Sequence, residues 1–280
     1  MQLAIIAKVL AAGCNKFRFK LITMKLIIQT GPAELGRSAG QLAGKIIREA
    51  IERRNEANIV LATGTSQFET LTNLTRENIP WYKVSIFHLD EYIGLPATSP
   101  ASFRRYLRER FVQMVGKLRE AYFINGEDDP LIVCRELSDV ISKVEIDIAM
   151  VGIGENGHLG FNDPPADFNT TQPFIQVNLD ERCRQQQFGE GWFASLDEVP
   201  RTAITMSIRQ IMKSRQIICS VPEARKAEAV KNCFERPPDN NYPASILQDH
   251  KACSCFLDLY SSALLTDSTI LRFKQNPFMP

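Results

Sequence analysis

Short apolar segments alternate with longer stretches of helical periodicity along this chain, and this alternation restricts the possible folds more than any other feature. Strand-like segments are Met24–Ile28, Ile59–Ala62, Val84–Leu89, Ile146–Ile153, Phe174–Leu179, Ile217–Val221 and Cys253–Leu259. Helical spacing of apolar residues covers 33–54, 67–74, 102–115, 131–144, 207–213 and 222–234. Strands that are apolar throughout and separated by helices are typical of a parallel sheet covered on both faces. We therefore expect an α/β fold, doubly wound and Rossmann-like, with a mostly parallel sheet.

The 280 residues, 44% hydrophobic and 23% charged, fit one globular domain. Residues 1–23 are treated separately, because the first predicted strand begins at Met24, which is also a candidate start. Lys8 interrupts the apolar run of this first segment and no basic region precedes it, unlike a signal peptide. We expect a non-secretory extension over 1–23 and a single domain over 24–280.

Charge and cysteine content exclude several classes of function. Lys and Arg total 33 against 32 Asp and Glu, so no broad positive field attracts nucleic acid. No apolar run reaches the roughly 20 residues that span a bilayer. The seven cysteines form no C-x-x-C pair and the three histidines have no H-x-x-x-H spacing, so no metal site is expected. Reduced thiols in the cytoplasm fit this pattern best.

The candidate catalytic and binding residues follow three of the predicted strands. These positions are the first candidates because ligands bind outside the carboxyl ends of the strands in such sheets. The first is Thr63-Gly64-Thr65-Ser66, between a strand and a helix. Free N–H groups and hydroxyls there could hold a phosphate, and the absence of a P-loop lysine favours a monophosphate. The alternative is an ordinary capping box formed by Ser66 and Glu69.

The second strand end is His88-Leu89-Asp90-Glu91-Tyr92, where two adjacent carboxylates leave the sheet. One of them could act as the base that removes a proton next to a carbonyl group. The alternative is that Asp90 or Glu91 caps the following turn.

The third strand end, Gly152-Ile-Gly-Glu-Asn-Gly-His158, formally matches the dinucleotide pattern G-x-G-x-x-G. Asp180 has nearly the spacing of a ribose contact, which keeps a nicotinamide site open as an alternative. However, the residues up to Pro165 lack helical periodicity, so we interpret the glycines as a tight loop that presents His158. A histidine titrates near neutral pH, and Asn156 and Asp163 are close enough in sequence to orient it.

Together the three motifs resemble the glucosamine-6-phosphate deaminase family, whose superfamily also contains 6-phosphogluconolactonases. The resemblance is carried by Leu61–Ser66, Phe87–Pro96 and Gly152–Pro164, with further similarity at Ala203–Ser207, Ala224–Ala227 and Ala244–His250. It implies an enzyme that converts an amino-sugar 6-phosphate to fructose 6-phosphate and ammonia without a cofactor. The steps would be ring opening, proton transfer from C2 to C1 and imine hydrolysis. Because the family commonly forms closed oligomers, the resemblance also allows a homo-oligomer.

The resemblance implies a role for individual residues. Asp90 matches the base that moves the proton, and His158 matches the histidine that opens the ring. Asp163 stands where the family has a glutamate that supports this histidine. Phosphate contacts are implied for Thr63, Gly64, Thr65, Ser66 and Lys226.

Three departures from the family pattern concern the same site. Asn156 replaces an aspartate beside the histidine, and Asp163 is one methylene shorter than the usual glutamate. Gln187 stands where bacterial deaminases have an arginine that clamps phosphate, which leaves Arg182, Arg184 or Arg209 as substitutes.

Residues 165–172 lack the basic cluster that binds an allosteric effector in some members. We therefore expect no activation by N-acetylglucosamine 6-phosphate.

Three alternatives remain open from the sequence. A 6-phosphogluconolactonase would use His158 to activate water on a lactone, although Asn162-Asp163-Pro164 favours the deaminase branch. An isomerase or deaminase acting on galactosamine 6-phosphate fits the motifs equally well. A non-catalytic sugar-phosphate sensor would keep the phosphate turn without turnover.

Overall fold

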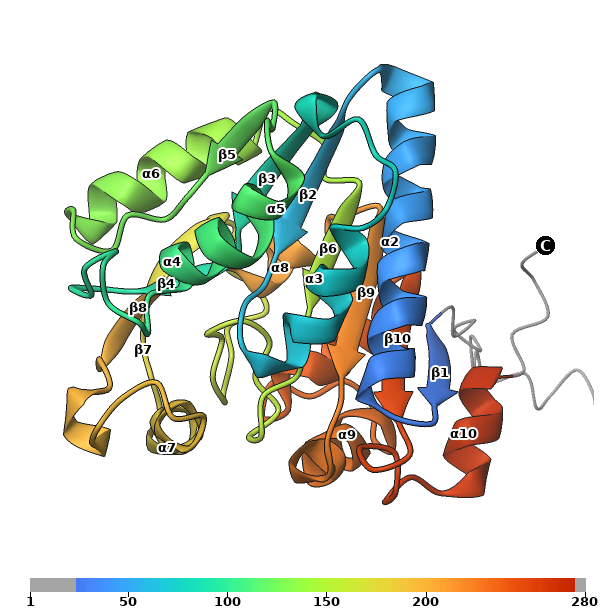
Figure 1. Cartoon of the computed structure of the whole chain (residues 1–280). Coiled ribbons are helices and arrows are strands. Elements are labelled where there is room, and N and C mark those ends of the chain that lie inside the picture. The colour runs from blue at the N-terminus through green and yellow to red at the C-terminus, as the bar shows by residue number, and fades with distance from the viewer. Residues whose placement is uncertain (1–23, 275–280) are drawn as a thin grey trace, which may run out of the picture.

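The computed structural model describes residues 24–274, and the extension expected over 1–23 lies outside the described residues. A seven-stranded sheet with the order β1-β10-β9-β6-β2-β3-β5 forms the centre (Figure 1). Every neighbouring pair in it is parallel. Its strands are β1 (Lys25–Gln29), β2 (Ala57–Leu61), β3 (Val84–His88), β5 (Glu120–Tyr122), β6 (Ile148–Val151), β9 (Gln216–Val221) and β10 (Cys253–Asp258). The predicted doubly wound, mostly parallel α/β fold is thus confirmed.

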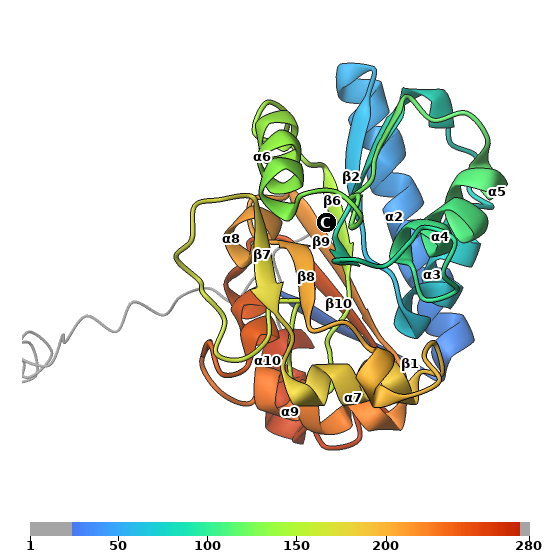
Figure 2. The ribbon, with the colours of Figure 1, turned by 90° about the vertical axis from the view of Figure 1, so that its left-hand side faces the viewer.

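Helices cover both faces of this sheet, as the edge-on view in Figure 2 shows. One face packs against α2 (Pro32–Arg54), α3 (Phe68–Leu74), α4 (Phe103–Leu107), a π-helical turn (Arg108–Val112) and α5 (Gln113–Val115). The other face packs against α6 (Pro130–Ile141), α8 (Ile208–Ile211), α9 (Ala227–Phe234) and α10 (Asp267–Lys274). Strands of such a sheet are buried on both sides, and all five residues of β2 and of β3 are buried accordingly.

Small residues bring α2 and α3 unusually close together. A Cβ atom at Gly36 would overlap Glu69 of α3, and one at Gly40 would lie 2.9 Å from the Cβ of Asn73. Glycine therefore permits the contact that fixes α3, and with it the turn between β2 and α3. Among residues 24–274, no helix is long and apolar enough to cross a membrane.

A second, antiparallel sheet was not predicted. It has the order β4-β8-β7 and consists of β4 (Asp90–Tyr92), β8 (Thr202–Met206) and β7 (Phe174–Asn178). The predicted strand Phe174–Leu179 therefore belongs to this sheet and not to the parallel one. Helix α7 (Glu181–Gly189), which the sequence did not predict, lies near the carboxyl ends of the parallel strands (Figures 1 and 2).

Candidate functional site

A cleft of about 520 Å³, including its open mouth, lies at the carboxyl ends of β2, β3, β6 and β9. All three predicted strand ends contribute to it, and α7 closes one side. Its polar lining comprises Thr63, Thr65, Ser66, Asp90, His158, Gln186, Gln187, Glu190 and Lys226. The expectation that residues far apart in the sequence meet at one edge of the sheet is met by this geometry.

The turn Thr63–Ser66 is held from two sides. The hydroxyl of Tyr106 donates a 3.1 Å hydrogen bond to the carbonyl of Gly64, whose φ of 89° suits glycine. The amide of Gln67 donates to the carbonyl of Val151 on β6 at 3.2 Å. Within the described chain, the buried Thr63 Oγ1 atom has no hydrogen-bond partner. The turn is therefore rigid while polar groups in it stay available to a ligand.

The alternative of a Ser66–Glu69 capping box is wrong. A three-residue 3₁₀ turn, Thr65–Gln67, precedes α3, and neither this turn nor α3 has a side-chain cap. Ser66 Oγ instead accepts a hydrogen bond from Gln67 at 3.2 Å.

Lys226 comes from the 3₁₀ turn Ala224–Lys226, between β9 and α9, and lines the same cleft. Its residue is only 2% exposed, and within the described part of the chain its ammonium group has no hydrogen bond or ion pair. Burial, with the nearby charge of Arg225, lowers the pKa of Lys226 to about 8, although Glu190 and two further glutamates oppose the shift. A buried cation without a partner is suited to receive an anion.

The two adjacent carboxylates of β4 separate, because neighbouring residues of a strand point to opposite faces. Asp90 lines the cleft. Glu91 is fully buried, accepts hydrogen bonds from Ser102 Oγ and the N–H groups of Phe103 and Arg104, and so anchors the start of α4. Only Asp90 is placed to meet a ligand.

The ionisation of Asp90 is shifted strongly. Burial and the negative charge of Glu91 raise its pKa to about 8, against a hydrogen bond from the Phe161 backbone N–H. Gly160 lies so close that a Cβ atom there would be 3.4 Å from Asp90 Oδ2. A carboxyl group that titrates near neutral pH in a cleft is a candidate acid or base.

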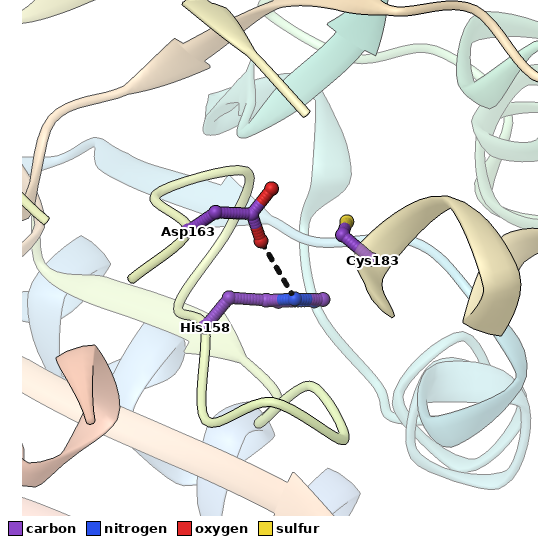
Figure 3. A group of neighbouring side chains, drawn as sticks. All are labelled: His158, Asp163 and Cys183. Carbon is purple, nitrogen blue, oxygen red and sulfur yellow. Dashed lines mark ion pairs between the residues drawn. The ribbon is translucent and has the colours of Figure 1, made fainter. Parts of the chain in front are cut away.

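His158 lies in a loop between β6 and β7, and Figure 3 shows its ring facing Asp163. Nδ1 of His158 is 3.2 Å from Asp163 Oδ1. Burial alone would raise the pKa of Asp163, but the close His158 ring and its charge, with hydrogen bonds from the Asp180 N–H and Asn156, hold it below its ordinary value. An ionised carboxylate at Nδ1 fixes the imidazole tautomer and leaves Nε2 for chemistry.

Asn156 ties this pair to α7. Its Nδ2 atom donates to Asp163 Oδ1 at 3.0 Å and to Asp180 Oδ2 at 2.9 Å, and its Oδ1 accepts from the backbone N–H of His158 at 3.0 Å. Asp180 also caps α7 by accepting from Cys183 N–H at 2.5 Å. Asp180 is therefore a helix cap and not a ribose contact, and no helix opens at Gly157, so the nicotinamide alternative has no structural support.

Cys183 completes a group with His158 and Asp163 whose potential metal-ligating atoms lie within 4.8 Å of one another (Figure 3). Burial, with the charges of Asp163 and Asp180, raises the pKa of the Cys183 thiol well above its ordinary value. Metals bind the thiolate, and the Asp163 oxygens already accept hydrogen bonds. The chemistry of these donors therefore favours a hydrogen-bonded support for His158 over a metal centre.

Sequence reasoning did not place the contribution of α7 to the cleft. Gln186 accepts from Glu155 N–H at 2.8 Å and donates to Glu190 at 3.1 Å. Gln187 Oε1 accepts a 2.8 Å hydrogen bond from Tyr92, which leaves its NH₂ group free to donate. Helix α7 is largely polar, without the apolar stripe that would have predicted it.

The three arginines considered as substitutes at Gln187 do not line the cleft. Arg184 is buried and donates to the carbonyls of Leu196 and Val199. Arg209 contacts the carbonyl of Asn169 at 3.5 Å. Arg182 is exposed in an adjoining groove.

Comparison with known proteins gives consistent matches. The family model described as glucosamine-6-phosphate isomerases/6-phosphogluconolactonase matches residues 30–255. A Bacillus subtilis protein named glucosamine-6-phosphate deaminase 1 is 33% identical over 231 residues, covering 80% of this chain and 94% of the relative. A solved monomeric glucosamine-6-phosphate deaminase has a TM-score of 0.78 at 31% identity, covering 86% of this chain and 100% of that one. A Trypanosoma brucei 6-phosphogluconolactonase shares the fold, with a TM-score of 0.72 at 16% identity and coverages of 88% and 100%.

Proposed function

The chain belongs to the family of glucosamine-6-phosphate isomerases and 6-phosphogluconolactonases, and we propose that within it the chain is a glucosamine-6-phosphate deaminase. The observation that carries the proposal is one cleft that holds Asp90, His158 and an unpaired Lys226 beside the Thr63–Ser66 turn. A deaminase needs a base at C2, a group that opens the ring and a phosphate site. A lactonase would not need the carboxyl group of Asp90.

The phosphate would bind at the Thr63–Ser66 turn, with Lys226 supplying positive charge. The buried Thr63 Oγ1 atom would donate to a phosphate oxygen, and the backbone N–H groups of the turn could do the same. The Gln187 amide, oriented by Tyr92, would add a neutral donor. This arrangement supports a sugar phosphate as substrate.

His158 would open the pyranose ring by moving a proton between the ring oxygen and the C1 hydroxyl. Asp163 would hold the imidazole in the required tautomer and stabilise its cation, while Asn156 would keep Asp163 in place. The glycine at position 154 supports the assignment, because a Cβ atom there would overlap the His158 ring.

Asp90 would then carry the proton from C2 to C1 of the open aldose. Its carboxylate accepts the C2 proton while the C2–H electrons form a C1=C2 double bond and the C1 carbonyl oxygen takes up a proton. The carboxyl group then returns its proton to C1 as the nitrogen lone pair forms the C2=N bond and the nitrogen gives up a proton. With nitrogen on C2, the product of this shift is a C2 imine, which water hydrolyses to fructose 6-phosphate and ammonia. A pKa of about 8 suits both halves of this transfer near neutral pH.

The cysteines and one solved relative also bear on the compartment and the assembly of the protein. The six described cysteines are free and buried, which fits a reducing cytoplasm. A solved relative is described as a monomeric deaminase, so a single copy of this chain could carry the complete site.

The test is ammonia release from glucosamine 6-phosphate, with galactosamine 6-phosphate and 6-phosphogluconolactone assayed in parallel. We expect ammonia from the gluco epimer and no lactone hydrolysis above background. Ammonia only from galactosamine 6-phosphate would show that the galacto epimer is the substrate. Lactone hydrolysis without ammonia release would show that the chain is a 6-phosphogluconolactonase. Binding of the sugar phosphate without any turnover would identify a sensor.

A further inference from the structure

Arg225 bridges four segments at the edge of the cleft. Its Nη2 atom donates a 2.7 Å hydrogen bond to Thr65 Oγ1. Its Nη1 atom contacts Glu155 at 2.9 Å and Glu190 at 3.2 Å, and its Nε atom contacts Glu223 at 2.6 Å. The guanidinium thus joins the turn after β2 to the loops after β6 and β9 and to the end of α7.

Arg225 is also suited to replace the missing arginine of α7. Where other deaminases clamp phosphate with an arginine, this chain has Gln187, and Arg184 and Arg209 are engaged elsewhere. Arg225 precedes Lys226 directly and lines the adjoining groove together with Arg182, but unlike Arg182 it reaches the Thr63–Ser66 turn through its hydrogen bond to Thr65. An arginine fork matches phosphate oxygens in a bidentate way that a lysine does not.

Glu190 is the unusual member of this group. Its side chain is 5% exposed, and its buried Oε2 atom has no hydrogen-bond partner within the described residues. A Cβ atom at Gly64 would lie 3.9 Å from that oxygen. A carboxylate so close to the turn would repel a phosphate dianion for as long as both are charged and in place.

We propose that Arg225 is a specificity residue for the phosphate group, and that Glu190 competes with the phosphate for its guanidinium. In the empty site Glu190 holds Arg225. When a phosphate binds at the turn, the Arg225–Glu190 ion pair is exchanged for an Arg225–phosphate pair. The residue at the end of α7, Glu190, then no longer contacts Arg225. This inference rests on the proposed phosphate role of the Thr63–Ser66 turn.

The test compares binding of inorganic phosphate to the wild-type protein, Arg225→Gln, Glu190→Gln and the double variant by isothermal titration calorimetry. Arg225→Gln should weaken phosphate binding about tenfold, as expected for one charge-assisted contact. Glu190→Gln should tighten it several-fold. In the double variant the gain should be clearly smaller, because only the direct repulsion between Glu190 and phosphate is then relieved, and no competition for Arg225 remains. Arg182→Gln, at an exposed position in the adjoining groove, is the matched control and should bind as the wild type does.

Thermal unfolding of each variant, and titration with unphosphorylated glucosamine, separate phosphate recognition from folding. Wild-type phosphate affinity in a folded Arg225→Gln variant, or weaker binding in Glu190→Gln, would overturn the proposal. Equal tightening by Glu190→Gln with and without Arg225 would also overturn it. Ammonia release is measured separately: a protein that binds phosphate as described but releases no ammonia would refute the deaminase function and leave this inference standing.

Discussion

The Nδ1 atom of His158 lies 3.2 Å from Oδ1 of Asp163. Asp163 stands where relatives have a glutamate, whose side chain is one methylene longer. From the sequence it was therefore open whether Asp163 contacts His158. The structure shows that the contact is made, because the loop of four residues between His158 and Asp163 curls so that the carboxylate lies beside the imidazole ring. Asn156 closes this arrangement by donating to Asp163 and Asp180 together.

Asn156→Asp, which restores the aspartate of well-known deaminases, should harm this protein. It would place a third carboxylate between Asp163 and Asp180 and remove both hydrogen bonds. We expect the free energy of unfolding to fall by about 1–3 kcal/mol at neutral pH. The loss should shrink as the pH falls, because crowding raises the folded-state pKa of the new carboxyl group and protonation relieves the repulsion.

Denaturant unfolding at pH 7.5 and pH 5 measures this effect. Asn169→Asp, on an exposed loop, is the control and should change stability by less than about 0.5 kcal/mol. An Asn156→Asp protein as stable as the wild type at both pH values would show that the amide bridge is unimportant.

Gly154→Ala should reduce ammonia release by about 100-fold or more while the protein still folds. The new methyl group overlaps the imidazole of His158 and forces it away from Asp163, and misplacement of a catalytic group by about 1 Å can cost about 10²-fold. Steady-state kinetics with circular dichroism measure both quantities. Gly31→Ala is the control, since nothing lies within 4 Å of its added Cβ atom. Full activity in Gly154→Ala would remove His158 from the mechanism.

The pH profile of kcat/KM should be bell-shaped and centred near pH 8. Activity should rise as Asp90 ionises with a pKa of about 8 and fall as Lys226 loses its proton, also with a pKa of about 8. Lys226→Arg should shift the alkaline limb of the profile to higher pH, because a guanidinium stays charged there. The acid limb should stay at the same pH. Substrate ionisations are common to both proteins and cancel in this comparison. An alkaline limb that stays unchanged in Lys226→Arg would contradict the assignment of Lys226.

Tyr92→Phe should raise KM about fivefold with little change in kcat. Without the 2.8 Å hydrogen bond from Tyr92, the Gln187 amide loses its fixed orientation and the substrate loses a positioned donor, a cost of about 1 kcal/mol. Initial rates across a range of glucosamine 6-phosphate concentrations separate the two constants. Tyr82→Phe, which is 59% exposed, serves as the control. An unchanged KM in Tyr92→Phe would exclude Gln187 from substrate binding.

The sequence predicted the central strands of the parallel sheet because they are buried on both faces and stand out as continuous apolar runs. It did not predict the largely exposed edge strand β5. It failed for β4, whose Asp90 and Glu91 resemble a polar turn, and for α7, which carries no apolar stripe. Both elements form because of tertiary contacts. Asp90 pairs with Thr205 of β8, and α7 begins at the Asp180 cap.

The same reasoning applies to the site. Asp90, His158 and the Thr63–Ser66 turn could be predicted because each follows a recognisable strand. The sequence did not show that Glu190 and Gln187 lie at the cleft, because their location depends on how α7 packs. The strand end alone did not decide between Asp90 and Glu91; the family resemblance implied Asp90, and the structure gives the physical reason, because Glu91 is turned toward α4.

The deaminase function is tested by ammonia release from glucosamine 6-phosphate by the wild-type protein, Asp90→Asn and His158→Gln, with 6-phosphogluconolactone hydrolysis measured on the same samples. We predict ammonia from the wild type, a loss of about 10²–10⁴-fold in each variant, and no lactone hydrolysis above background. If the wild type and Asp90→Asn both hydrolyse the lactone and no sample releases ammonia, the protein is a lactonase and not a deaminase.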